Sequence, residues 1–218
     1  MGKKFNKIIN SICEGICTVI YPIENYCILC NTEDCIGICN TCKSKIKKTQ
    51  NYLNDDIISY GYYGGALKEL ILKFKYKSNF TAGNILAKLL EQYLIENINY
   101  KEYIITYIPI SKKSKKIRGF NQCEYLAKII SKDLCVEYLE TLIKVKETKE
   151  QKTLKKQERA ENIKGAFNIK HNVKLKNKKI ILIDDVTTTG NTINEGYNLL
   201  KKYGAKEIKL LTLAKSHI

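Results

Sequence analysis

The chain has 218 residues, of which 44% are hydrophobic and 28% are charged, and its formal net charge is +16 at pH 7. This length fits one mid-sized domain with a small appendage, and the composition is that of a globular protein rather than a disordered one. No apolar run approaches the roughly 18 residues of a membrane span, and the amino-terminal stretch, which contains Glu14 and cysteines, lacks a signal-peptide pattern. We therefore expect a cytoplasmic protein that does not insert into a membrane.

The excess of positive charge lies in the carboxy-terminal half of the chain. Residues 101–218 carry 26 Lys and Arg against 13 Asp and Glu, whereas residues 1–100 carry 12 against 9. Such an excess recruits phosphates and predicts a nucleic-acid partner, whereas an AT-biased genome that favours Lys codons is the alternative explanation. Arg occurs only at Arg118 and Arg159 in a Lys-rich chain, which indicates either a need for a planar bidentate group at these positions or chance placement. The candidate residues for binding DNA are Lys112, Lys113, Lys115, Lys116 and Arg118.

The first predicted element is an amphipathic helix over residues 5–20, because apolar residues recur there at helical spacing and the pattern stops before Pro22. Cys13 and Cys17 lie on its apolar face and are interpreted as core residues.

Residues 27–42 contain five cysteines, several turn formers and few large apolar side chains, so they cannot build a core of their own. Two CxxC pairs have the spacing of a tetrahedral structural zinc site, and a reducing compartment disfavours disulfides. The predicted zinc ligands are Cys27, Cys30, Cys39 and Cys42. Cys35 is either a substitute ligand or a free thiol. Cys123 and Cys135 are interpreted as buried residues that flank a helix.

The remainder of the chain alternates between strand-like and helix-like segments. We place one domain at residues 1–53 and a second at residues 54–218. The first part of the second domain is expected to contain a Gly-rich turn and two helices within 60–94, a strand at 103–110, a basic loop at 111–120 and a helix at 121–131. A mobile loop or an exposed helix is expected at 144–164. The last part is expected to contain a strand at 178–186, a loop at 187–192, a helix at 193–204 closed by Gly204, and a strand at 205–215. This alternation predicts an α/β fold with a mainly parallel sheet flanked by helices.

The most specific motif is the segment IILIDDVTTTGNT, residues 180–192. Its apolar half predicts a buried strand, and ligands of open α/β sheets bind beyond the carboxyl ends of the strands, where Asp184 and Asp185 follow. The threonine-rich loop then leads into a helix, so hydroxyls, backbone amides and the positive end of a helix dipole converge on one volume that suits a phosphate. Two carboxylates beside it suit the hydroxyls of a sugar, which predicts a ribose 5-phosphate ligand.

Other phosphate-binding motifs do not match. The chain has no GxxxxGKS/T segment and no GxGxxG segment after a strand. A receiver domain also has an acidic pair, but that pair lies near the start of the domain, and too little chain follows Asp185 to complete such a sheet. An acidic pair and a threonine run that only cap a turn are the remaining structural alternative.

The segment of residues 180–192 resembles the signature of type I phosphoribosyltransferases, which bind phosphoribosyl diphosphate (PRPP). Further segments resemble the ComF family of late competence proteins over nearly the whole chain. They are YPIENYCILC with a second CxxC downstream, PIS at 109–111 with the basic loop, RGFNQ at 118–122, Gln151, ERAEN at 158–162 and GAF at 165–167. Where the family usually has Arg in the loop after Pro109, this chain has Lys, which keeps the charge and loses the bidentate geometry.

The resemblance implies a type I phosphoribosyltransferase-like domain with a small amino-terminal zinc-binding domain. It implies that Asp184 and Asp185, the candidate catalytic residues, contact the ribose hydroxyls, and that Ser111 and Lys112 lie near the diphosphate with Mg²⁺. The cradle for the 5-phosphate would be Thr188, Thr189, Gly190, Asn191 and Thr192. Phosphoribosyl transfer also requires a positioned base, and no residue pattern indicates a pocket for one.

Three functions follow from these observations. The first is a ComF-like accessory protein of natural transformation that binds PRPP and, through its basic surface, single-stranded DNA. The second is an active phosphoribosyltransferase of unknown base specificity. The third is an interaction module whose zinc segment docks a partner such as the helicase-like ATPase of the DNA-uptake machinery.

Overall fold

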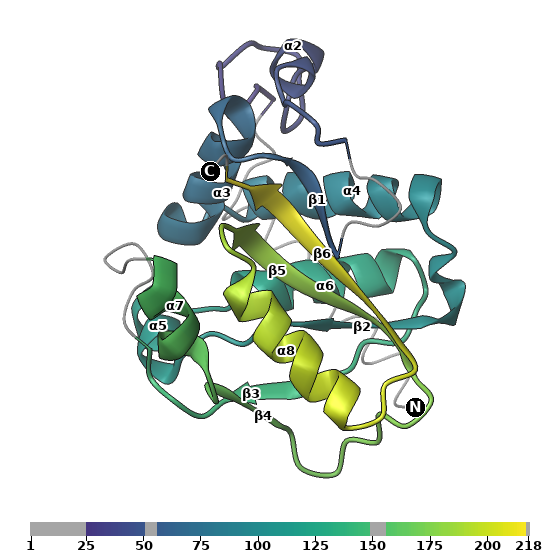
Figure 1. Cartoon of the computed structure of the whole chain (residues 1–218). Helices are drawn as coiled ribbons and strands as arrows, with labels where there is room; N and C mark the ends of the chain where they lie inside the picture. Colours follow the sequence, from purple (N-terminus) through teal and green to yellow (C-terminus); the bar gives the residue numbers. More distant parts are fainter. Residues whose placement is uncertain (1–24, 51–55, 149–155, 217–218) are drawn as a thin grey trace, which may run out of the picture. The chain divides into compact units, whose positions relative to one another are not determined.

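The computed structural model describes residues 25–50, 56–148 and 156–216 (Figure 1). The chain divides into two compact units, Met1–Lys43 and Ser44–Ile218. The helix expected at residues 5–20, with Cys13 and Cys17, and the domain boundary expected between residues 53 and 54 lie outside the described residues.

The Ser44–Ile218 unit is built on a parallel four-stranded sheet with the strand order β1-β6-β5-β2. Its strands are β1 (Ile57–Tyr62), β2 (Tyr103–Tyr107), β5 (Lys179–Thr187) and β6 (Glu207–Lys215). Every residue of β2 is buried, and residues 180–183 of β5 are fully buried, which is the continuous apolar pattern of parallel strands covered on both faces. The expected parallel α/β class and the strands expected at 103–110, 178–186 and 205–215 are confirmed.

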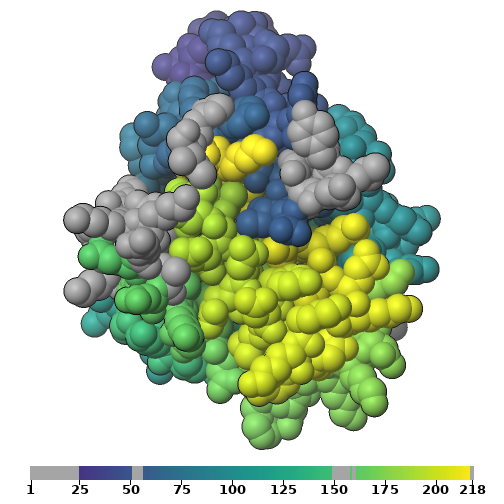
Figure 2. Space-filling view, in the orientation of Figure 1, coloured from purple at the N-terminus to yellow at the C-terminus, as the bar shows by residue number. Residues whose placement is uncertain are grey.

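Helices cover both faces of this sheet. They are α3 (Gly65–Lys77), α4 (Phe80–Asn97), α6 (Gln122–Asp133) and α8 (Asn191–Lys202), with a 3₁₀ turn η1 (Tyr100–Glu102) before β2. In Figure 1, α8 lies in front of the sheet while α4 and α6 lie behind it. Figure 2 shows that α8 and β6 make up much of the near face of this unit. Within the described residues, no helix is both long and apolar enough to cross a membrane.

Local sequence signals explain where these helices begin and end. The Asn79 side chain accepts a hydrogen bond from the backbone N–H of Ala82 (2.8 Å), and the Asn121 side chain accepts one from that of Cys123 (2.9 Å), so an Asn caps α4 and α6. Gly204 follows α8 with a positive φ of 91°, a conformation that glycine adopts without strain. The closure of this helix by Gly204 is thereby confirmed.

A short antiparallel pair lies beside α8. Its strands are β3 (Leu142–Lys144) and β4 (Phe167–Ile169). Leu142 and Phe167 belong to one buried cluster with Ile193 and Leu200 of α8, so the pair extends the core. The segment expected as a mobile loop or an exposed helix contains the helix α7 (Lys156–Ile163).

Two expectations for this unit are corrected. The Gly-rich turn begins later than expected, since residues 63 and 64 form a bend before α3, and the basic loop is largely helical. Residues 57–62 form the strand β1 where a Gly-rich turn was expected at 60, and a Cβ at Gly61 would lie 2.8 Å from Leu67 Cδ2 and from the Lys47 carbonyl oxygen. Gly61 therefore allows β1 to pack closely against Leu67 and the backbone of Lys47 and does not form a turn. The expected basic loop is largely the helix α5 (Lys112–Arg118), capped by Ser111 and closed by Gly119 with a φ of 80°.

In the Met1–Lys43 unit, the described residues form a turn at 28–30, bends at 34 and 36–38, and the start of the helix α2 (Asn40–Ser44). Tyr26 and Glu33 make an antiparallel bridge. The buried side chains of residues 25–43 are Cys27, Ile28 and Cys42. This confirms that the segment lacks an apolar core of ordinary size.

Candidate functional site

A hollow lies at the carboxyl end of β5, where the strand passes into α8. It is lined by Asp184, Val186, Thr187, Thr188, Thr189, Gly190, Asn191, Thr192 and Ile193. The structure therefore brings the first acid of the pair together with the whole predicted threonine loop. Asp185 does not line this hollow.

Gly190 shapes the floor of the hollow. It precedes α8 with a φ of 77°, and a Cβ at this position would lie 2.8 Å from Ile57 Cδ1. Having no side chain, Gly190 does not cap the helix, so the positive end of the α8 dipole is directed at the hollow without a side-chain acceptor from the N-cap residue. This arrangement suits a bound anion.

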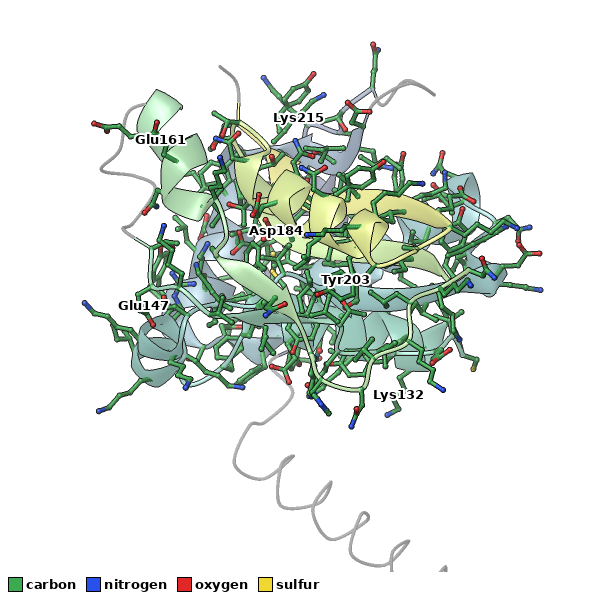
Figure 3. All side chains as sticks on the ribbon, turned by 60° about the horizontal axis from the view of Figure 1, so that its bottom comes forward. Lys132, Glu147, Glu161, Asp184, Tyr203 and Lys215 are labelled. Atoms are coloured by element: carbon green, nitrogen blue, oxygen red, sulfur yellow. The ribbon has the colours of Figure 1, made fainter. Side chains whose placement is uncertain are left out.

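Asp184 is a buried carboxyl group in the wall of the hollow, toward the middle of the unit (Figure 3). Its Oδ1 accepts hydrogen bonds from the Asp185 backbone N–H (2.8 Å) and from the Cys123 thiol (3.6 Å). Burial and the neighbouring Asp185 charge raise the pKa of Asp184 to about 7. Asp184 is thus able to accept or donate a hydrogen bond near neutral pH.

Asp185 lies in a different environment, because successive residues of a strand point to opposite faces of the sheet. Its Oδ2 accepts from Lys75 Nζ of α3 at 2.5 Å, and its Oδ1 accepts from the Val186 backbone N–H at 2.6 Å. Burial acts to raise the pKa of Asp185, but the Lys75 ammonium group outweighs burial, and the pKa is lowered. Arg118 adds a second positive charge that lowers it further. The acidic pair therefore has one carboxyl group facing the hollow and one held in an ion pair.

Lys75 was missed by the sequence reasoning. The buried stripe of α3 is Leu67, Leu70, Ile71 and Phe74, and Lys75 follows Ile71 by four residues. Its place at the edge of an apolar stripe could have predicted an acidic partner, since buried lysines are rare without one.

Lys144, at the end of β3, was also missed. Burial lowers its pKa, and the charges of Glu147 and Asp184 act in the opposite direction. Its Nζ donates a hydrogen bond to Thr148 Oγ1 at 2.8 Å. The site therefore has a second lysine near the acidic pair.

The predicted diphosphate residues lie on α5 rather than in the hollow. Ser111 is buried, and its Oγ accepts from the Ser114 backbone N–H at 3.1 Å. Glu147 Oε1 accepts from the Lys113 backbone N–H at 3.4 Å, and the hydrogen bond with Ser111 lowers the pKa of Glu147. In Figure 3, Glu147 lies at the edge of the unit, whereas Asp184 lies inside it. Neither Ser111 nor Lys112 lines the hollow.

The candidate DNA-binding residues of α5 are brought together on one short helix. The side chains of Lys112, Lys113, Lys115 and Lys116 are exposed, and only Lys115 among them forms a salt bridge within the described residues, to Glu124 at 3.6 Å. The Arg118 guanidinium is half-buried and donates a hydrogen bond to Gln122 Oε1 at 3.3 Å. The basic surface therefore differs from the hollow in both position and exposure.

Four cysteines form a second candidate site in the Met1–Lys43 unit. The thiol sulfurs of Cys27, Cys30, Cys39 and Cys42 all lie within 4.8 Å of one another, and those of Cys30 and Cys39 are 3.6 Å apart. The Asn31 backbone N–H donates to the Cys27 carbonyl at 2.8 Å, and Asn31 has a positive φ of 58°, so the first CxxC pair forms a tight knuckle. The four predicted ligands are thus grouped as a metal ion requires.

The geometry and chemistry of this group suit zinc. Tetrahedral coordination with Zn–S bonds of about 2.3 Å separates the sulfurs by about 3.8 Å. The backbone N–H groups of Cys39 and Cys42 donate to the sulfurs of Cys27 and Cys39, both at 3.4 Å. Cys35 does not belong to the group. Of the other two cysteines, Cys123 is buried as expected, but Cys135 is exposed, because it lies after the end of α6 in a left-handed conformation.

Comparison with known proteins places these features in a family. The family model described as the phosphoribosyl transferase domain matches residues 121–218. Competence protein F of Haemophilus influenzae is 30% identical over 214 residues, which is 95% of this chain and 91% of that protein. Competence protein ComFC of Streptococcus pneumoniae is 31% identical over 88% of this chain and 81% of its own length, and the DNA utilization protein YhgH of Escherichia coli is 26% identical over 73% and 72%. The chain belongs to the ComF family of competence proteins, with a phosphoribosyltransferase-type α/β domain and an amino-terminal cysteine cluster that can hold a metal ion.

Proposed function

We propose that this chain is a cytoplasmic accessory protein of DNA uptake that binds PRPP, or a related ribose 5-phosphate, in the hollow at the carboxyl end of β5, and single-stranded DNA on its basic surface. The observation that carries the proposal is the hollow itself. Its wall joins one carboxyl group, a run of threonines and the uncapped start of α8. The similarity to competence protein F and to the DNA utilization protein YhgH supports the role in DNA uptake.

The 5-phosphate would lie against the threonine loop. Backbone N–H groups at the start of α8 and the hydroxyls of Thr188, Thr189 and Thr192 are donors that suit phosphate oxygens, and Gly190 and Asn191 complete the turn. A ribose attached to that phosphate would meet Asp184. Asp184 Oδ2 makes no hydrogen bond within the described residues, so it remains available to a ribose hydroxyl.

Asp185 would contribute through the charge arrangement around it. Lys75 and Arg118 give this side of the acidic pair an excess of positive charge, which suits the diphosphate of PRPP. Ser111 and Lys112 would approach the diphosphate from α5. Mg²⁺ prefers oxygen ligands from one or two carboxylates together with substrate phosphates, and Asp184 supplies such a carboxylate. When bound, Mg²⁺ would neutralise charge on the diphosphate.

The cysteine cluster would hold one structural Zn²⁺. All four positions are filled by thiol ligands, which is typical of a closed structural site rather than a catalytic one. The zinc ion would replace the core that residues 25–43 lack.

Single-stranded DNA would bind through the cations of α5. Three of its four lysines form no salt bridge within the described part of the chain, so they are available to phosphates. Each phosphate neutralised on a single strand contributes about −0.7 to the slope of log affinity against log salt. Replacing Lys112, Lys113, Lys115 and Lys116 by Ala should therefore flatten that slope by up to about 3 and weaken binding to all sequences alike.

A calorimetric titration of the full chain with PRPP and Mg²⁺ tests the ligand proposal. We expect binding of one PRPP per chain, weakened about tenfold or more by Asp184→Asn, which corresponds to about 1.4 kcal/mol. Asp133→Asn is the matched control, because Asp133 pairs with Lys88 at 2.9 Å and does not line the hollow. Absence of binding at millimolar PRPP would refute the proposal. Release of diphosphate with one of a set of purine and pyrimidine bases would instead assign phosphoribosyltransferase activity.

A further inference from the structure

The helix α5 has ordinary capping residues at both ends but lacks a buried face. None of its seven residues is buried, and its one large apolar residue, Ile117, is 76% exposed. Helices of this length are not stable by propensity alone and usually bury an apolar face. Figure 1 shows α5 at the edge of the unit, away from the sheet. An outward-facing helix with this composition is suited to contact a partner.

The charge of this region indicates the chemistry of that partner. The helix carries five positive charges in the sequence KKSKKIR and has no acidic residue. Lys77, at the end of α3, adds an exposed cation that forms no salt bridge within the described residues. Charge complementarity therefore favours a polyanion.

An exposed aromatic ring lies directly beside these cations. Tyr76 of α3 is 54% exposed, and the Arg118 guanidinium carbon lies 5.5 Å from the centre of its ring. The Arg118 guanidinium also donates a hydrogen bond to Gln122, so its position is fixed by Gln122 as well as by Tyr76. Aromatic rings and guanidinium planes are the groups on which unpaired bases stack.

The neighbouring aromatic residue Phe120 packs inside the unit. Its ring lies 5.1 Å from those of Phe74 and Phe80, inside an aromatic cluster with Tyr125. This cluster fixes the junction between α3 and α4 against the segment that follows α5. Tyr76 therefore follows a buried member of this cluster, Phe74, by two residues.

We propose that Tyr76 and Arg118 form a stacking platform for the bases of single-stranded DNA, with the α5 lysines holding the adjacent phosphates. This inference rests on the proposed binding of DNA. It adds two residues that would stack on the flat faces of the bases. Double-stranded DNA would satisfy the lysines but would leave the platform unused, because its bases are already stacked on one another. An acidic protein would likewise leave the ring without a base.

The absence of Trp from the chain makes a direct test available. Tyr76→Trp keeps a stacking ring and introduces a single indole fluorophore, whereas Tyr76→Ala removes the ring. Tyr203 is the matched control, because it is also a half-exposed tyrosine (47%) but lies after α8. The probe is a 30-nucleotide single strand, with the same sequence as a duplex for comparison.

We expect Tyr76→Ala to weaken single-strand binding by about tenfold and to leave the salt slope unchanged, because stacking neutralises no phosphate. Fluorescence of Tyr76→Trp should be quenched by the single strand, and that of Tyr203→Trp should not. Wild-type affinity in Tyr76→Ala, an unquenched Trp at position 76, or an equal loss of duplex binding would each overturn the platform. If Tyr76→Ala binds normally while the four-lysine variant does not, DNA binding stands without the platform. If wild type binds no single strand even at low salt, both fail.

Discussion

The cysteine segment of residues 27–42 and the carboxyl end of β5 hold their polar groups in place by different means. The first has Cys27, Ile28 and Cys42 as its buried side chains, and two of these three belong to the cysteine group that can hold a metal ion. The second follows a strand whose residues 180–183 are fully buried. A site of the first kind depends on its ligand for its fold, whereas a site of the second kind is formed before its ligand arrives.

The largest expected effect is the loss of structure in the cysteine segment. Cys42→Ser should abolish zinc binding and open residues 25–43, because structural zinc contributes on the order of 10 kcal/mol to folding of such segments. Zinc content and limited proteolysis of the full chain measure this effect. The Ser44–Ile218 unit has its own core and should retain its cooperative unfolding.

Cys35→Ser is the control for this prediction, since Cys35 is not among the four grouped cysteines. It should keep the zinc and the protection from protease. A metal-free wild-type chain whose residues 25–43 resist protease would contradict the structural role of the metal.

The second prediction disturbs the preformed region through Lys75. Lys75→Met should destabilise the Ser44–Ile218 unit by about 3 kcal/mol, because it leaves the Asp185 carboxylate buried without its partner. The side chains of Lys75 and Asp185 are only 19% and 16% exposed, so solvent screens the pair little. Denaturant unfolding followed by circular dichroism measures the loss.

Lys73→Met on the same helix provides the matched control. Its partner Glu69 lies at 3.7 Å and is 51% exposed, so a change of about 0.5 kcal/mol or less is expected. The double variant Lys75→Met with Asp185→Asn should recover part of the stability. Equal losses for Lys73→Met and Lys75→Met would show that the ion pair has no special role.

A smaller effect concerns the pH dependence of ligand binding. Because the pKa of Asp184 is raised to about 7, the group is protonated at pH 6 and ionised at pH 8. A ribose hydroxyl donates more strongly to a carboxylate, so affinity for ribose 5-phosphate should rise about tenfold over this interval. Because folding raises the pKa of Asp184, protonation of this group stabilises the folded protein. That contribution to the free energy of unfolding is lost as the pH rises through 7.

Asp184→Asn separates this effect from the titration of the ligand phosphate. The variant should keep only the pH dependence that the phosphate itself causes. An unchanged profile in the variant would mean that Asp184 does not contact the ligand.

Much of the sheet and one half of the site could be predicted from the sequence, because they depend on local patterns. The apolar run at 180–183, the acids after it and the threonine loop lie consecutively in the chain, so their order fixes where they meet. The pairing of Asp185 with Lys75 joins residues 110 positions apart, and no local pattern indicates it.

The elements that were missed lack a local hydrophobic pattern. β3 and β4 have three residues each, too few for a strand pattern, and they are stabilised by packing against α8. The helix α5 has no apolar periodicity at all and is defined by Ser111 and Gly119 at its ends. Its lysines obscured these capping signals and led to the expectation of a loop.

Hydrogen exchange of the full chain, with and without PRPP and Mg²⁺, tests the central claim most directly. If PRPP binds in the hollow, the backbone amides of residues 186–193, which surround it, should exchange more slowly, and residues 25–43 should not change. Binding of PRPP without protection of residues 186–193 would contradict the assignment of this hollow as the ligand site.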